Sequence, residues 1–368
     1  MASFDHTHYV PFLKGKAGEF AALAQLSVDQ RQPLTPLIDV PPERVKFFKG
    51  GQFQIETVEK ALAGYAEQIA EAWGSVDHCF VDLGGFDPDH RMDDGRHPLT
   101  AFFEDARAAG IAPIPVTGID RDRPQLDAVR EVCTTWRLGA AIRLRRPELQ
   151  KNGEQLREVL PKLLALIDQQ PHQIDLVLDF GELLKSQVTE VEQEARSVIA
   201  SFPFLDEWRS LTLCSGAFPS QISDFVGTQS SGERPRRDFN LWQRLMKSGA
   251  PLSRLPAFGD CGVAAADWPS AFNPMEMNPS CKIIYASDEE WLIEKGRSFR
   301  DYGGEQYRTL AAQVKARPGF LTASHCQTEK KVIDCAANRG GTGGLKEWVT
   351  AATRHHIEVV SRQLASLP

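Results

Sequence analysis

The chain has 368 residues, of which 42% are hydrophobic and 25% charged, a composition typical of a globular protein. Its formal net charge of -7 argues against a general attraction to nucleic acid or to an anionic membrane, although it leaves room for one basic pocket. No apolar run approaches the ~20 residues that span a bilayer, and the N-terminal residues do not resemble a signal peptide, so we expect a cytoplasmic protein with no membrane partner.

From the N-terminus onward, a short apolar run, a polar loop and an amphipathic segment alternate. The runs are short and continuously apolar, as strands covered on both faces must be. Eight runs are predicted to be strands: Tyr9–Leu13, 35–40, 78–83, 112–117, 139–144, 174–180, 210–215 and 255–260.

Helical spacing of apolar residues marks the segments between these runs. The longest such segment, 54–73, repeats apolar side chains at intervals of three and four residues, which predicts one continuous helix. Similar patterns predict helices over 99–109, 124–136, 154–168, 187–201 and 238–248.

Eight strand–helix units in series are what a closed (β/α)8 barrel of the TIM type requires. An open doubly wound sheet would show nearly the same alternation. The count of eight favours the barrel, and no GxGxxG motif follows the first run, which removes the usual dinucleotide-binding interpretation of an open sheet.

After the eighth run the alternation stops. Residues 281–295 predict a β-hairpin, 304–316 a helix, and 345–364 a final helix that follows a glycine-rich loop. With no linker in view, we expect a single domain, with a barrel core over about 8–265 and a tail over about 266–368 folded onto it. The segment 230–237, "SSGERPRR", is expected to be a mobile basic loop.

Seven scattered cysteines, none spaced as CxxC, indicate reduced thiols and predict neither a zinc knuckle nor a disulfide framework. Most are expected to be small core residues. In the last helical segment His355 and His356 are adjacent and point in different directions, so they make a poor metal pair and are interpreted as packing residues.

Charged and polar residues stand where the predicted strands end, and in barrel enzymes the chemistry lies at the carboxyl ends of the strands. Each could instead belong to a solvated network or cap a turn. The residues at these ends are Lys14, Asp39, Asp82, Thr117, Arg143, Arg145, Asp179, Ser215 and Asp260.

This set suits an anionic ligand. Arg binds phosphate or carboxylate through two parallel hydrogen bonds and Lys binds as a point charge, while aspartates hold Mg²⁺ or transfer protons. The candidate catalytic residues are Asp82, Asp179 and Lys14, and the candidate substrate-binding residues are Lys16, Asp39, Arg143 and Asp260. Mg²⁺ is the candidate cofactor. We expect Lys14 to point into the barrel mouth within salt-bridge reach of one of these aspartates, and Lys16 to be more exposed. A nucleophilic role for Ser215 lacks a partner base.

Several stretches resemble the beta family proteins, which are found in phages, phage satellites and bacterial mobile genetic elements. The resemblance rests on "YVPFLKGKAGEFAAL", "LTPLIDVP", "FVDLGG", "IIYASDEEWLIEKG" and "EWVTAATRHHIEVV", which together span nearly the whole chain. It implies a bacterial setting linked to phage conflict and antiviral defence, and it assigns no catalytic residue.

Two classes of function therefore remain open. The first is an enzyme or binding protein for a phosphate-containing, nucleotide-like or otherwise anionic small molecule, with a metal-assisted phosphoester hydrolase as its catalytic form. The second is a non-catalytic immunity protein that recognises a phage component or a protein encoded in its own operon.

Overall fold

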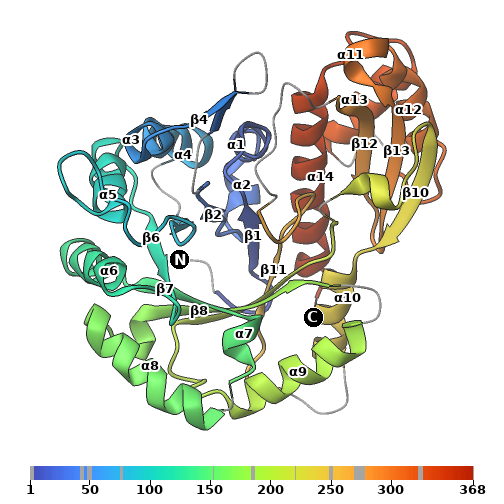
Figure 1. Ribbon diagram of the computed structural model, residues 1–368. Coiled ribbons are helices and arrows are strands. Elements are labelled where there is room, and N and C mark those ends of the chain that lie inside the picture. The colour runs from blue at the N-terminus through green and yellow to red at the C-terminus, as the bar shows by residue number, and fades with distance from the viewer. Residues whose placement is uncertain are drawn as a thin grey trace.

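Eight parallel strands form a closed barrel in the computed structural model of the chain (Figure 1). The structure describes residues 4–41, 45–47, 52–74, 78–151, 153–183, 187–219, 221–247, 252–268, 278–321 and 326–367. The barrel strands are β1 (Tyr9–Leu13), β2 (Leu37–Asp39), β5 (Phe80–Asp82), β6 (Ile114–Thr117), β7 (Ala140–Arg145), β8 (Ile174–Glu182), β9 (Ser210–Gly216) and β11 (Ala257–Asp260). Strand β1 closes the barrel because it pairs with both β2 and β11. The predicted barrel is confirmed, and each predicted apolar run overlaps one of these strands.

Helices surround the barrel. Helix α6 illustrates why they form: the Asp122 carboxylate accepts the Gln125 N–H at 2.7 Å, Pro124 lies in the first turn, and the apolar face buries Val129. The helices of this outer layer are α1 (Ala17–Ala24), α4 (Tyr65–Trp73), α5 (Pro98–Ala108), α6 (Arg123–Trp136), α8 (Gly153–Ile167), α9 (Val188–Ser201), α10 (Arg237–Lys247) and α14 (Leu345–Ala365). Shorter turns are α2 (Val28–Arg31), α3 (Val58–Leu62), α7 (Arg146–Leu149) and the 3₁₀ helices η1 (Pro171–Gln173) and η3 (Ile222–Asp224).

The prediction of one helix over 54–73 is wrong. The chain first forms a hairpin of β3 (Val45–Phe47) and β4 (Phe53–Ile55), and then the two helices α3 and α4. Gly64 separates the helices because its backbone is left-handed, with φ of 70°. The apolar residues keep a helical spacing across both α3 and α4, so the sequence pattern does not show that a turn at Gly64 divides them.

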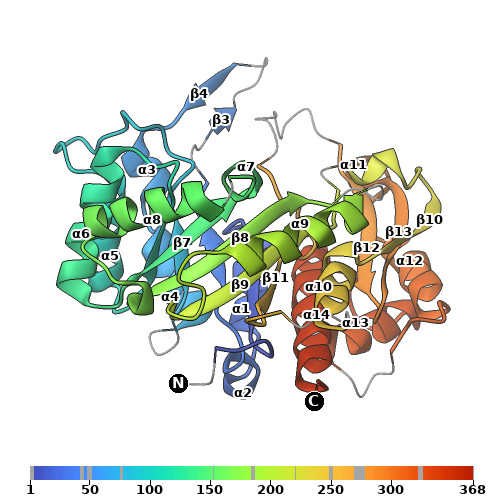
Figure 2. The ribbon, with the colours of Figure 1, turned by 90° about the horizontal axis from the view of Figure 1, so that it is seen from below.

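An antiparallel sheet with its own helices lies beside the barrel (Figures 1 and 2). It consists of β10 (Ser230–Pro235), β13 (Glu290–Ser298) and β12 (Ser280–Ala286), with helices α11 (Phe299–Tyr302), α12 (Gln306–Lys315) and α13 (Gln327–Ala336). The hairpin predicted over 281–295 and the helix predicted over 304–316 are confirmed. The prediction of a mobile loop over 230–237 is wrong, because β10 pairs with β13 along its whole length.

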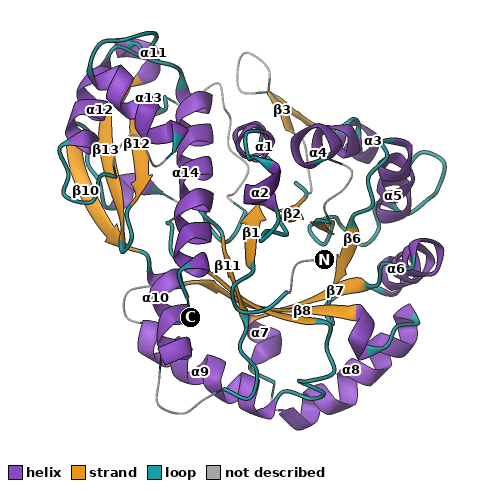
Figure 3. Ribbon diagram, turned by 180° about the vertical axis from the view of Figure 1, so that it is seen from behind, coloured by secondary structure: helices purple, strands orange, loops and turns teal. Residues whose placement is uncertain are grey.

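Helix α14 joins the two parts of the molecule, as Figure 3 shows from behind. It packs against α1 and β1 on one side and against β12 on the other. Ile357 and Val360 belong to the core around the barrel, whereas Trp348 packs with Tyr307 in the core under the added sheet. The last helix thus takes the place of the eighth outer helix. The added sheet is built from two segments: β10 lies between β9 and α10, and β12, β13 and their helices lie between β11 and α14.

Side chains of the barrel strands alternate between an inner and an outer face. Val10 and Phe12 of β1 lie in a small inner core with Ala141 of β7, while Tyr9 and Leu13 pack outward against the helices. This alternation decides which strand-end residues reach the barrel mouth. Among the described residues, no helix is long and apolar enough to cross a membrane.

Candidate binding site at the barrel mouth

Arg143 is the centre of an ionic network on the inner face, at the carboxyl ends of the strands. Its Nη2 and Nε lie 2.6 and 2.9 Å from Oδ2 of Asp179, and its Nη1 lies 2.9 Å from Oδ2 of Asp82. Oδ2 of Asp39 is 3.8 Å from the same Nη1. The structure therefore brings together three of the four aspartates expected at this rim.

Lys14 joins the network at its edge, as predicted. Its Nζ donates to Oδ2 of Asp39 at 3.1 Å and to the carbonyl oxygen of Ala266 at 2.7 Å. The chain can turn after Lys14 because Gly15 has a φ of 58°, a conformation in which a Cβ would overlap the Tyr65 hydroxyl.

Trp268 covers both lysines near the start of the chain. The Lys14 Nζ is 4.8 Å from the centroid of its indole ring, and the Lys16 Nζ is 5.7 Å away. Lys16 is exposed, as expected, while Lys14 is buried. The indole Nε1 of Trp268 is itself buried without a hydrogen-bond partner among the described residues.

Arg121 completes the network and was missed by the sequence analysis. Its Nη2 lies 3.2 Å from Oδ1 of Asp82, and its Nη1 donates to the Gly84 carbonyl at 2.9 Å. The residue lies in the loop between β6 and α6 and not at a strand end. Only the closeness of that loop to the third strand of the barrel reveals its role.

Buried charges in this network stabilise one another. Burial alone would raise the pKa of Asp82, but the guanidinium groups of Arg121 and Arg143 lower it to about 2. The pKa of Arg143 lies well above its usual value because the carboxylates of Asp179 and Asp82 outweigh the effect of burial. Three cations face three buried carboxylates, and the carboxylate of Asp120 lies 3.3 Å from Nε of Arg121, so the network carries no excess of positive charge.

Asp260 does not join this network, which corrects the expectation that it faces the mouth. Its Oδ1 accepts a hydrogen bond from the Tyr9 hydroxyl at 2.7 Å, and its Oδ2 lies 2.7 Å from Nε2 of His356 on α14. Tyr9 and Phe258 pack outward, and Asp260 shares their face of the barrel wall. His356 is thus the packing histidine that the sequence indicated.

The remaining strand-end residues differ in their surroundings. Arg145 follows Arg143 on the inner face of β7, and its side chain is exposed with no ion pair among the described residues. The hydroxyls of Thr117 and Ser215 are buried without hydrogen-bond partners in the described part of the chain. Ser215 therefore shows no partner base, as the sequence indicated.

The closed strand order and this ionic mouth define a (β/α)8-barrel protein that carries an added three-stranded sheet beside the barrel. The chain belongs to the Beta protein family, whose model matches residues 9–362. The family resemblance seen in the sequence is confirmed.

Comparisons with curated proteins and with solved structures are less informative than the family match. No curated protein matches the chain. Among solved structures, the chain is similar to triosephosphate isomerase from Bartonella henselae, with 13% sequence identity over 69% of this chain and 91% of that chain, and a TM-score of 0.34.

Proposed function

We propose that the protein binds a small anionic molecule, with a phosphate or carboxylate group, at the mouth of its barrel. The observation that carries the proposal is a set of hydrogen-bond donors left over at one place. The Lys14 ammonium has three N–H groups and uses two of them. Within the part of the chain that the structure describes, the Lys16 ammonium has no ion pair and the Trp268 indole N–H has no acceptor.

The network beneath these donors is suited to hold them in place. A buried ion pair is seldom more stable than well-packed apolar residues of the same volume, so six charges at one mouth are poorly explained by stability alone. Beside this network, the exposed cations Lys16 and Arg145 have no ion pair among the described residues, and an anion would supply their counter-charge.

A metal-assisted phosphoester hydrolase at the same mouth is less well supported. Such an enzyme needs carboxylates available to Mg²⁺ or to a proton. Asp39, Asp82 and Asp179 are instead held by Lys14, Arg121 and Arg143. A carboxyl group with a pKa of about 2, as in Asp82, is a weak base, which favours a role in positioning the two arginines.

The biological setting stays a prediction. The family resemblance implies a link to phages and mobile elements, and a role in defence or a protein partner would follow from it. All seven cysteines are free, which agrees with the predicted cytoplasmic location.

Isothermal titration with inorganic phosphate, adenosine monophosphate and citrate tests the proposal. We expect at least one probe to bind, and the affinity to fall by about tenfold, or about 1.4 kcal/mol, in Lys16→Met, because that ammonium loses its charge but keeps an apolar stem. Raising the salt concentration should weaken binding as well.

Lys315→Met is the matched control, since Lys315 is an exposed lysine at the end of α12. It should bind the probe as the unmodified protein does. Failure of all three probes to bind, or equal loss in Lys16→Met and Lys315→Met, would contradict a site at the mouth. Preference among the probes separates phosphate from carboxylate recognition.

A further inference from the structure

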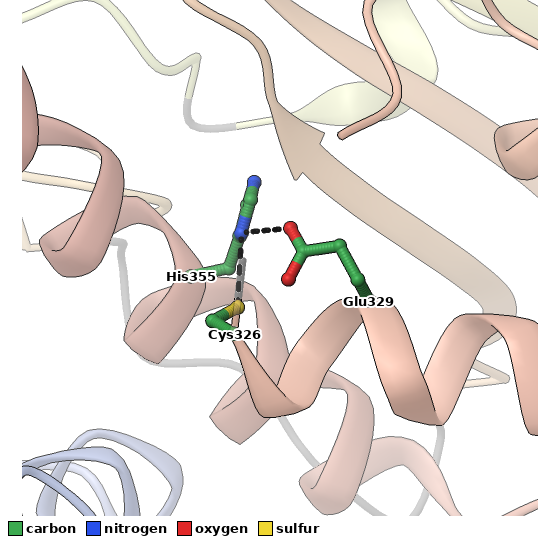
Figure 4. A group of neighbouring side chains, drawn as sticks. All are labelled: Cys326, Glu329 and His355. Atoms are coloured by element: carbon green, nitrogen blue, oxygen red, sulfur yellow. Dashed lines mark hydrogen bonds and ion pairs between the residues drawn. The ribbon is translucent and has the colours of Figure 1, made fainter. Parts of the chain in front are cut away.

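A second polar cluster lies in the inserted part of the molecule, outside the barrel. Cys326 is the N-cap residue of α13, Glu329 lies in its first turn, and His355 lies on α14 (Figure 4). One potential ligand atom from each side chain lies within 4.8 Å of the other two. Glu329 and His355 have fully buried side chains, and Cys326 is partly exposed.

The orientation of His355 is fixed by a backbone contact. Its Nε2 lies 2.7 Å from the carbonyl oxygen of Ala286, which can only accept a hydrogen bond, so Nε2 carries the proton. In neutral imidazole Nδ1 then presents a lone pair to the other two side chains. Histidines that bind metals are oriented in this way, with the second ring N–H donated to a carbonyl or carboxylate.

Atoms that carry lone pairs face one another inside this cluster. The His355 Nδ1 lies 3.0 Å from Oε1 of Glu329 and 3.6 Å from Sγ of Cys326. A lone pair facing a carboxylate at that distance is repulsive unless a proton or a cation lies between them. The other carboxylate oxygen, Oε2 of Glu329, is buried and has no partner among the described residues.

The distance of 3.6 Å between Sγ of Cys326 and Nδ1 of His355 matches a metal site. A tetrahedral Zn²⁺ bound at about 2.3 Å from sulfur and about 2.0–2.1 Å from nitrogen holds those two atoms roughly 3.5 Å apart. Surrounding contacts fix the carboxylate and cover the imidazole, because the Tyr285 hydroxyl donates to Oε1 of Glu329 at 2.8 Å and the Tyr285 ring stacks on His355 at 4.0 Å.

We propose that Cys326, Glu329 and His355 bind one divalent transition metal ion, with Zn²⁺ the best fit to a sulfur, nitrogen and oxygen ligand set. The ion would tie the start of α13 to α14 and so fix the inserted sheet against the barrel. The partly exposed Cys326 gives it a route of entry. This site is independent of the anion site proposed at the barrel mouth.

Metal content of the full-length chain, purified without a metal-affinity column, is the first measurement. We expect about one zinc ion per chain in the unmodified protein. After removal by a chelator, Zn²⁺ should rebind, and Co²⁺ should give a thiolate-to-metal absorption band that Cys326→Ser lacks.

Cys335→Ser is the matched control, because Cys335 is a second, buried thiol on α13 outside the cluster. It should retain the metal. Changes next to a ligand cost about 10–100-fold in metal affinity, so removing a ligand in Cys326→Ser or Glu329→Gln should cost more than about 100-fold.

Two results would overturn the site: a metal-free protein that fails to bind Zn²⁺ or Co²⁺, or Cys326→Ser binding both as tightly as Cys335→Ser does. If Cys326→Ser does not fold, the metal content and cobalt spectrum of the unmodified protein decide the question. A metal-free, stable protein would identify the cluster as an imidazolium–carboxylate pair.

Discussion

Asp82 and Asp260 stand at the ends of two barrel strands, and neither side chain is exposed, yet they have opposite surroundings. Asp82 faces inward and meets the guanidinium groups of Arg121 and Arg143. Asp260 faces outward and meets a phenol and an imidazole, both ordinarily uncharged at neutral pH. The side of the barrel wall to which a carboxylate points therefore decides whether it is part of a charged mouth or of a packing interface.

The residues around Asp260 on the outer face, here called the outer group, include Asp238, Arg236 and His356. This group has fewer cations to compensate its carboxylates than the inner network has. Asp238 lies close enough to Asp260 for the two to repel, and burial together with this repulsion raises the pKa of Asp238 to about 7. Arg236 is fully buried there, and its Nη1 donates to the Ser287 carbonyl and to the Gln363 side chain. Asp82 of the inner network is thus kept charged, whereas the outer group holds one carboxyl group with a lowered pKa, Asp260, beside one with a raised pKa, Asp238.

The largest effect should come from removing the centre of the inner network. Arg143→Leu leaves Asp82 without its second guanidinium group and Asp179 without its partner, and breaking a buried ion pair on one side costs about 3–5 kcal/mol. Urea unfolding should record a loss of that size in the free energy of unfolding.

Arg145→Leu is the control on the same strand, because that side chain is exposed. It should change the free energy of unfolding by no more than about 0.5 kcal/mol. Equal stability of the two variants would show that the inner network contributes little to the free energy of unfolding. The difference between the inner and outer faces would then not be a difference in stability.

The second prediction concerns pH, which should act in opposite directions on Asp82 of the inner network and on Asp238 of the outer group. Asp238 has a folded-state pKa of about 7 against a usual 3.8, so the folded state holds a proton that the unfolded state has released. Stability from this group is complete below about pH 4 and falls as pH rises to about 7, by at most about 4 kcal/mol. Asp82, with its pKa of about 2, adds stability above about pH 4 that is lost as pH falls towards 2.

Thermal melts between pH 4 and 8 test this. Asp238→Asn should flatten the decline in melting temperature that the unmodified protein shows over that range. Asp224→Asn, which changes an exposed carboxylate, should leave the decline as it is. An unchanged slope in Asp238→Asn would mean that this carboxyl is ionised in the folded protein at pH 5.

Strand positions could be predicted because strands covered on both faces must be apolar throughout. That same continuity hides which side each residue faces, since the alternation that normally shows it is absent. Lys14, Asp39, Asp82, Arg143 and Asp179 were correctly expected to meet. Asp260 was placed with them because a run such as 255–260 gives no sign of its inner face.

Other features depended on contacts between distant segments. Arg121 lies in a loop, and its partner Asp82 is 39 residues away. The proposed metal cluster joins Cys326 and His355, from two helices whose packing the sequence does not specify. Adjacent histidines argue against a shared site, but the spacing Cys-x-x-Glu at 326–329 places two ligands on one helical face and was the available signal.

The third prediction concerns one hydrogen bond of the outer group, between Tyr9 and Asp260. Tyr9→Phe removes the hydroxyl that donates to Oδ1 of Asp260 and leaves the ring in place. Hydrogen bonds to charged groups contribute about 1.5–3 kcal/mol, so the free energy of unfolding should fall by about that amount.

Tyr302→Phe is the control, at a tyrosine that is 55% exposed, and it should change the free energy of unfolding little. A loss in Tyr9→Phe as small as in that control would indicate that water replaces the missing donor, and that the outer group is wetter than its burial implies.

The last prediction returns to the lysine at the edge of the inner network. Lys14→Met keeps the apolar stem but removes the charge that Asp39 contacts at 3.1 Å. The nearby Arg143, at 3.8 Å, still compensates Asp39 in part, so we expect a loss of only about 1–2 kcal/mol. Adding Asp39→Asn should recover some of it, because the orphaned carboxylate is then neutral, whereas Lys16→Met should stay within about 0.5 kcal/mol. Urea unfolding of the four proteins measures the pair, and a double variant less stable than Lys14→Met alone would mean that Asp39 is held mainly by Arg143.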